Sequence, residues 1–215
     1  MTSRYLHQLF TPSVKAAQEA HGSRHAYARA DAPTGEPDRL TPREATFISM
    51  RDSFYMATNS ASGWPYLQHR GGPRGFVKIL DEGRLGFADF RGNRQYIGLG
   101  NLEADDRASL FFMDYVRRAR LKVLGRIRSI DLADCPALAA LLVDEDYGAK
   151  VERGLIVEID SYDWNCPQHI TPRYSGNEIH RFVKPLKDRI AALEATLVRE
   201  RRLLARLSAA QKLPG

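Results

Sequence analysis

Short strand-like segments with brief connections dominate the middle of this sequence and restrict what it can fold into. The segments span residues 53–60, 64–71, 75–81, 84–90, 107–115 and 118–131. Several of the connections hold glycine and acidic residues, and their shortness favours antiparallel neighbours. Six such strands with little helix between them predict a small closed or split β-barrel.

The segment 118–131 shows the strand period most clearly. Leu121, Val123 and Ile127 fall on one side of an extended chain, while Lys122 and Arg126 fall on the other. Alternation of this kind is typical of a strand with one face in a core and the other in water. We therefore expect Leu121, Val123 and Ile127 in the core.

Helices are expected to flank these strands. Thr41, Pro42 and Glu44 form a helix start, because threonine caps, proline suits the first turn and glutamate completes a capping box. Further helices are expected at residues 12–21, 135–144 and 185–211, and one more strand at 153–163. The predicted fold class is mainly β with flanking helices (α+β): a six-stranded antiparallel split barrel plus a long C-terminal helix. The expected domains are residues 1–40 (extension and linker), 41–174 (split barrel) and 175–215 (helical extension).

The terminal helix carries a leucine-rich stripe. Its members are Ile190, Leu193, Leu197, Leu204 and Leu207, which follow three- and four-residue steps that Glu200 interrupts. We expect the stripe to dock on a barrel or on another subunit.

The net charge argues against a nucleic-acid partner. Of the formal +6, residues 184–215 contribute +5, through eight Lys/Arg and three Asp/Glu, so the remainder carries +1. The basic segment lacks the interleaved aromatic residues that single-strand binders use.

No run approaches the roughly 18 apolar residues of a membrane span. The start of the chain lacks a signal peptide's apolar core. Cys135 and Cys166 lack metal-site spacing, so we expect reduced thiols, no metal and a cytoplasmic protein.

The loop that follows residue 90 combines side chains suited to an anion. Arg91, Asn93, Arg94 and Gln95 surround Gly92. Arginine offers a fork of donors, amides donate neutral hydrogen bonds, and glycine lets the backbone approach closely. A phosphate site is one interpretation, and a solvated connection is the other.

The central block resembles the pyridoxamine 5′-phosphate oxidase-like FMN-binding split-barrel family. The resemblance rests on the ordered segments "WPYLQHRGGPRGFVKIL", "LGFADFRGNRQYIGLGNL", "DDRASLFFMDY" and "RLKVLGRIRSID", and covers roughly residues 41–174. It implies a homodimer that binds one FMN per subunit at the interface. It also implies that Asn93, Arg94 and Gln95 hold the FMN phosphate.

The resemblance implies further contacts with FMN. The expected cofactor-binding residues are His69, Arg70, Gly71, Val77, Lys78, Phe87, Ala88, Asn93, Arg94, Gln95, Arg120, Trp164 and Arg173. For Lys78 and Arg120, a solvent-facing strand position is the alternative. His169 and Arg173 are the candidate catalytic residues, since histidine titrates near neutrality and arginine can bind a substrate acid. A structural role for His169 stays open.

The expected function is an FMN-dependent oxidoreductase that performs two-electron transfer on an unidentified small molecule. Its electron donor would be a reduced nicotinamide or a separate reductase. The C-terminal segment differs from that of the true oxidase, because a long helix replaces it, so we expect a substrate other than a B6 vitamer. Two alternatives remain: a non-catalytic flavin- or haem-binding protein, with His69, His169 or His180 as haem ligand, and a structural dimer whose terminal helix recruits a partner.

Overall fold

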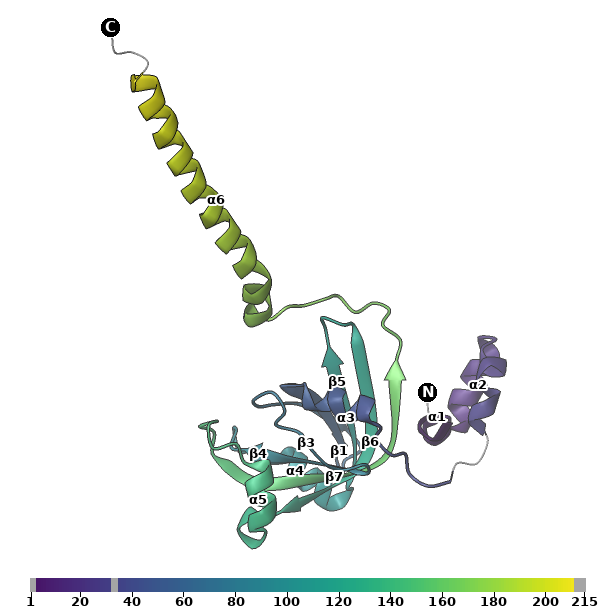
Figure 1. Ribbon diagram of the computed structural model, residues 1–215. Coiled ribbons are helices and arrows are strands. Elements are labelled where there is room, and N and C mark those ends of the chain that lie inside the picture. The colour runs from purple at the N-terminus through teal and green to yellow at the C-terminus, as the bar shows by residue number, and fades with distance from the viewer. Residues whose placement is uncertain (1–2, 32–34, 211–215) are drawn as a thin grey trace. The chain divides into compact units, whose positions relative to one another are not determined.

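The computed structural model describes residues 3–31 and 35–210, and its elements are labelled in Figure 1. The chain forms two compact units, Met1–Thr171 and Pro172–Gly215. Within the described residues, no helix is both long and apolar enough to cross a membrane.

The first unit is built on one antiparallel sheet. Its strands are β1 (Ser53–Asn59), β2 (Pro65–Gly71), β3 (Lys78–Asp81), β4 (Arg84–Phe90), β5 (Arg107–Asp114), β6 (Ala119–Ile130) and β7 (Val151–Asn165). Their order is β2-β1-β5-β6-β7-β4-β3. The expected α+β class with an antiparallel split barrel is confirmed. The sheet has seven strands rather than six, because β7 pairs with both β6 and β4 and so joins the two halves of the sheet.

The core lies on the inner face of this curved sheet. Leu121, Val123 and Ile127 of β6 are buried, as their alternation predicts. The aromatic centre is Phe54, whose ring centroid lies 5.2 Å from that of Phe87 and 5.0 Å from that of Phe112. Rings at these separations contribute both buried area and favourable ring contacts.

Short helices fill the connections. They are α3 (Pro42–Ser49), α4 (Ile97–Ala104), the 3₁₀ turn η2 (Leu132–Asp134) and α5 (Pro136–Leu142). The predicted start of α3 is confirmed: the Thr41 hydroxyl accepts from the backbone of Arg43, and the Thr41 backbone donates to Glu44. Figure 1 shows α5 beside β4 and β7.

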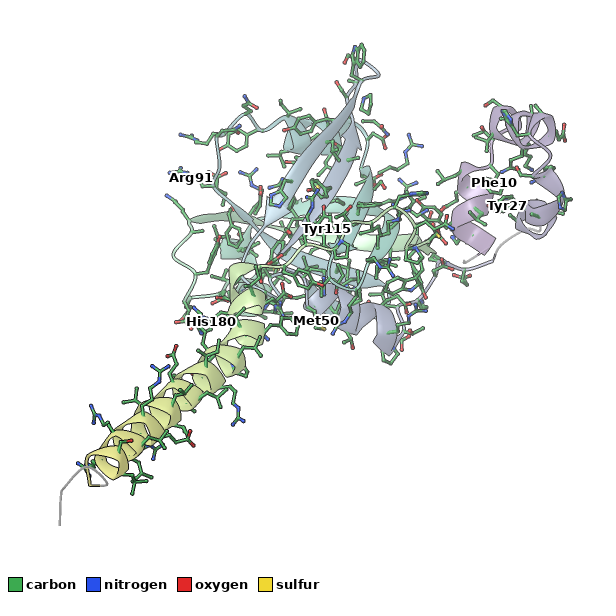
Figure 2. The ribbon with its side chains drawn as sticks, turned by 90° about the horizontal axis from the view of Figure 1, so that it is seen from above. Phe10, Tyr27, Met50, Arg91, Tyr115 and His180 are labelled. Carbon is green, nitrogen blue, oxygen red and sulfur yellow. The ribbon has the colours of Figure 1, made fainter. Side chains whose placement is uncertain are left out.

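The N-terminal extension is more ordered than its polar sequence indicates. It forms α1 (Ser3–Leu9), the predicted α2 (Pro12–Ala20) and the 3₁₀ segment η1 (Arg24–Asp31). Phe10 and Tyr27 pack edge to face at 5.5 Å and hold these helices together (Figure 2). Tyr5 is buried against β6 and β7, where the Lys122 ammonium lies 4.6 Å from its ring. Burial, together with the nearby Asp163 carboxylate, raises the pKa of Tyr5 to about 12.

The second unit contains one long helix, α6 (Gly176–Ala210). It begins at Gly176 rather than at residue 185, so the predicted start is wrong. The Ser175 backbone donates to Glu178 at 2.8 Å, and the Glu178 backbone donates to the Ser175 hydroxyl at 3.3 Å, which forms a capping box ahead of Pro185. Pro185 lies inside the helix and removes one backbone donor without ending it.

Candidate functional site

A cleft of about 390 Å³ opens where the sheet is split. β2 is one edge of the sheet, and β4 lies next to the other edge, β3, so these strands have no ladder between them. Side chains from β2, the end of β4, the following loop, the start of α4 and the start of β7 line this space. The split barrel therefore creates the cleft, and the surrounding loops supply its polar groups.

The inner wall of the cleft is apolar. Phe76 and Phe87 line it and are buried in the core, and Ala88 continues the same surface. The ring centroids of Phe76 and Phe87 lie 6.4 Å apart in an edge-to-face arrangement, which fixes the shape of this wall. A flat, partly apolar ligand would find a rigid surface here.

A network of charged side chains crosses the split between β2 and β4. Arg70 of β2 forms an ion pair with Asp89 of β4. The second carboxylate oxygen of Asp89 lies 3.6 Å from Nε of Arg153, its cross-strand neighbour in β7. Only 20% of the Arg70 side chain and 11% of the Asp89 side chain are exposed. This network holds the two sides of the cleft together in place of backbone hydrogen bonds.

The loop after β4 is tied to β7 by a second network. The Arg94 guanidinium donates to the Tyr96 hydroxyl at 3.2 Å, and that hydroxyl donates to Glu152 at 3.2 Å. Arg91, labelled in Figure 2, donates to the same carboxylate at 3.0 Å. The hydrogen bond from Arg91, with that from Tyr96, keeps the pKa of Glu152 below its usual range. Glu152 therefore stays ionised and anchors the loop.

The loop backbone adopts a left-handed conformation at two positions. Arg94 has a φ of 62° and Tyr96 a φ of 53°. Such values are uncommon for residues other than glycine and mark local strain. The Asn93 side chain accepts from the backbone of Gln95 at 3.2 Å and supports the turn. The result is a tight turn whose arginine and amide side chains are exposed to solvent.

Two buried donors in the cleft lack partners among the described residues. They are Nε2 of Gln68 and Nε of Arg70. A buried donor without an acceptor costs about 1–3 kcal/mol. The Gln68 amide lies close to Gly98, where an added Cβ would approach Nε2 to 2.3 Å and the amide would have to shift. Unsatisfied donors held in a cleft are typical of a site completed by a ligand.

The structure brings together eight of the thirteen residues expected to bind cofactor. His69, Arg70, Gly71, Phe87, Ala88, Asn93, Arg94 and Gln95 all line the cleft. The phosphate-binding interpretation of the loop therefore gains a cavity, although the residue assignments themselves stay predictions.

Four of the other five lie elsewhere in the first unit. Val77 is 1% exposed in the core, and Lys78 begins β3. Arg120 lies on the outward face of β6, because Leu121 beside it points inward. Trp164 donates to Glu44 at 2.6 Å and packs against α3, so its indole is engaged away from this cleft.

The two proposed catalytic candidates are not part of the cleft lining. His169 is exposed, with a φ of 61°. Arg173, the last of the thirteen, belongs to the second unit. Within the first unit, His169 is thus not among the residues that line this cleft.

Sequence reasoning missed several residues of the site. They are Gln68, Asp89, Tyr96, Glu152 and Arg153. Gln68 could have been found, since it is two residues from Arg70 in a strand and so shares its face. Glu152 and Arg153 could not, because they reach the loop only through the pairing of β4 with β7.

Comparisons with known proteins agree with the position of the barrel. Residues 40–165 match the sequence profile of the family described as pyridoxamine 5′-phosphate oxidase. No curated protein matches the chain by sequence.

Several solved structures are similar to part of the chain. HupZ of Group A Streptococcus is 12% identical and covers 63% of this chain and 100% of its own, with a TM-score of 0.45. A Clostridium acetobutylicum protein related to general stress protein 26 is 13% identical and covers 64% of this chain and 94% of its own, with a TM-score of 0.43. An FMN-binding protein from Syntrophomonas wolfei is 10% identical and covers 69% of this chain and 97% of its own, with a TM-score of 0.43.

Proposed function

The chain belongs to the pyridoxamine 5′-phosphate oxidase family, and we propose that it is an FMN-dependent oxidoreductase acting on a small molecule by two-electron transfer. The observation that carries this proposal is the cleft at the split of the barrel, with its unpaired donors and its excess of positive charge. Bound FMN would supply the redox chemistry, and the chain would supply binding, orientation and electrostatics.

The charges of the cleft fit a phosphate group. Arg70, Arg91 and Arg94 line the cleft with Asp89 and Glu152, and Arg153, outside the lining, contacts Asp89. These four cations and two carboxylates leave a net charge of +2. A terminal phosphate dianion neutralises this excess. Arginine forks and exposed amides suit its oxygens.

The start of α4 adds backbone donors to the same place. The residue before this helix, Tyr96, provides no side-chain cap, and Ile97, Gly98 and Leu99 line the cleft. The first backbone N–H groups of a helix lack intrahelical partners and favour anions. Together with Asn93 and Arg94, these groups would surround a phosphate from two sides.

The inner cleft fits the remainder of FMN. Phe76 and Phe87 exclude water from one side of the space. The unpaired Nε2 of Gln68 and Nε of Arg70 would donate to polar groups of a ligand there. The ion pair with Asp89 orients the Arg70 guanidinium, so its donors are in place before the ligand arrives.

We further propose a homodimer formed through the outer face of the sheet. Tyr55 and Leu67 expose 37% and 65% of their surface there. Tyr55 is the cross-strand neighbour of both Phe111 and His69, and His69 also lines the cleft. An apolar face beside the site would place the cofactor close to the second subunit, which could contribute further contacts.

The electron donor would be a reduced nicotinamide or a separate reductase in the cytoplasm. The pyridoxamine 5′-phosphate oxidase family assignment covers residues 40–165, whereas α6 lies beyond it. A substrate other than a B6 vitamer is consistent with that different C-terminal part.

The substitution Arg94→Ala tests the phosphate site. Loss of one charge-assisted hydrogen bond costs about 1.5–3 kcal/mol, so FMN affinity should fall roughly 10- to 100-fold. Riboflavin, which lacks the phosphate, should lose little. Fluorescence titration measures both. Arg84→Ala is the matched control, since Arg84 pairs with Asp81 at an exposed hairpin away from the cleft. Equal losses for FMN and riboflavin would refute the assignment.

The absorption spectrum of the purified protein tests the cofactor class. Flavin bands are expected. A Soret band would instead favour a haem protein, for which His69 offers a ligand in the cleft. A protein that neither copurifies with flavin nor binds added FMN would contradict the proposed function.

A further inference from the structure

The long helix α6 exposes an apolar stripe along most of its length. Its 35 residues span about 52 Å at 1.5 Å per residue. Leu186, Ile190 and Leu193 are 64%, 55% and 48% exposed. Isolated helices are marginal in water, and apolar stripes of this size mark interaction sites.

The stripe follows a continuous heptad repeat. Alternating steps of four and three residues connect Ile179, Val183, Leu186, Ile190, Leu193, Leu197, Glu200, Leu204 and Leu207. This spacing is the a/d seam of a coiled coil rather than a random scatter of leucines. Pro185 falls at a c position, on the side away from the seam, where it does not obstruct a second helix.

We propose that α6 pairs with α6 of a second copy of this chain in a parallel, two-stranded coiled coil. The a positions begin with Val183 and Ile190, and three of the d positions are leucines: 186, 193 and 207. β-Branched residues at a with leucine at d, as in the heptads of Val183 and Ile190, favour two parallel strands. The proposal concerns α6 alone and does not depend on flavin binding.

Charges beside the seam support the parallel arrangement. In parallel pairs, a g residue of one helix faces the e residue of the next heptad of the other. Arg189 occupies g and Glu194 occupies e, so each Arg189 would face Glu194 of the second copy, twice by symmetry. The other three g positions hold Phe182, Thr196 and Leu203, so no like charges face each other across these pairs.

Glu200 is the single polar residue of the seam, and it sets the register. In a parallel pair, a d side chain enters a hole that includes the neighbouring e residue of the second helix, which here is Arg201. The two Glu200 side chains would share this d layer, and Arg201 of each copy would lie beside Glu200 of the other and offset their repulsion. In an antiparallel pair, d residues face a residues, and every a residue of this helix is apolar, so Glu200 would be left against a hydrocarbon side chain. One polar layer lowers stability but specifies partner and register.

Disulfide trapping in the full chain tests this arrangement. Leu186→Cys is introduced with Cys135 and Cys166 replaced by serine. Facing d residues of a parallel pair lie within the roughly 4.4–6.8 Å Cα separation that a disulfide tolerates. Leu186→Cys should therefore form a covalent dimer under mild oxidation at least about ten times faster than Ala195→Cys, the control at an outward f position.

Two further outcomes would overturn the proposal. Equal cross-linking rates at residues 186 and 195 would show that the helices meet only by chance or dock elsewhere. Cross-linking only in a mixture of Leu186→Cys with Leu204→Cys would indicate an antiparallel pair.

Charge reversal provides an independent arm of the test. In the Leu186→Cys background, Arg189→Glu should slow cross-linking by about tenfold, because two attractive pairs become repulsive. The double change Arg189→Glu with Glu194→Arg should restore the rate, since the opposite charges face each other again. Failure of the double variant to recover, while Arg189→Glu alone slows the reaction, would contradict the parallel register.

Discussion

The charge network across the split of the barrel makes Asp89 the most informative position to perturb. Asp89 forms ion pairs with both Arg70 and Arg153. The substitution Asp89→Asn keeps the size of the side chain and one acceptor oxygen but removes its charge. Arg70 would then lose this ion pair, whereas Arg153 would keep its contact with Glu152 at 3.2 Å.

The expected loss of stability follows from the exposure of the three side chains. Removing one member of a buried ion pair costs about 3–5 kcal/mol. Here 20% of Arg70, 18% of Arg153 and 11% of Asp89 remain exposed, and the asparagine oxygen still accepts a hydrogen bond. We therefore expect a loss of about 2 kcal/mol in the free energy of unfolding, or roughly 4–8 °C in melting temperature.

Urea denaturation of the full chain, followed by tryptophan fluorescence, measures this change. The matched control is Asp81→Asn, which breaks a pair with Arg84 that is 42–48% exposed, and should cost about 0.5 kcal/mol or less. Inorganic phosphate should stabilise Asp89→Asn more than the unaltered protein, because the variant has one more uncompensated cation in the cleft. A loss no larger than the control's would refute the structural role of this network. Stabilisation by phosphate that is smaller than in the unaltered protein would refute the electrostatic account of the cleft.

Two further predictions concern stability. Gly125→Ala should lower the free energy of unfolding by about 1–3 kcal/mol in urea denaturation, because its Cβ would lie 2.6 Å from the carbonyl oxygen of Glu158. Gly100→Ala, in open space within α4, should raise it slightly. Equal effects of the two substitutions would contradict this prediction. For Asp114, burial raises the pKa, but the Arg117 backbone and the Arg51 guanidinium outweigh it and hold the pKa below its usual value. Because the pKa of Asp114 is lower in the folded state, its ionised form stabilises the fold above the unfolded pKa of about 3.9, and this contribution is lost as pH falls below that value. Asp114→Asn should therefore flatten the acid side of a curve of unfolding free energy against pH. An unchanged curve would refute this role of Asp114.

Local sequence was sufficient where short-range chemistry decides the structure. The alternation of β6 and the capping box at Thr41 needed no tertiary information. The predicted start of α6 at residue 185 is wrong, because Ser175 and Glu178 provide a cap upstream and Pro185 lies inside the helix. The strand count depended on β7, whose two partners cannot be deduced from its own residues.

The candidate site divides along the same line. Its exposed donors, Asn93 and Arg94, lie in one loop and are visible as a sequence pattern. Arg94 is held by Tyr96 of the same loop, whose hydroxyl donates to Glu152 of β7, so the position of Arg94 depends on strand pairing. A loop donor that is free in solution loses conformational entropy when it binds, whereas one already held by the fold loses less. Anion affinity in this cleft should therefore depend on Glu152 as well as on the arginines, even though Glu152 itself repels an anion. The composition of the loop predicts an anionic ligand, and the register of β4 with β7 would determine how tightly that ligand is held.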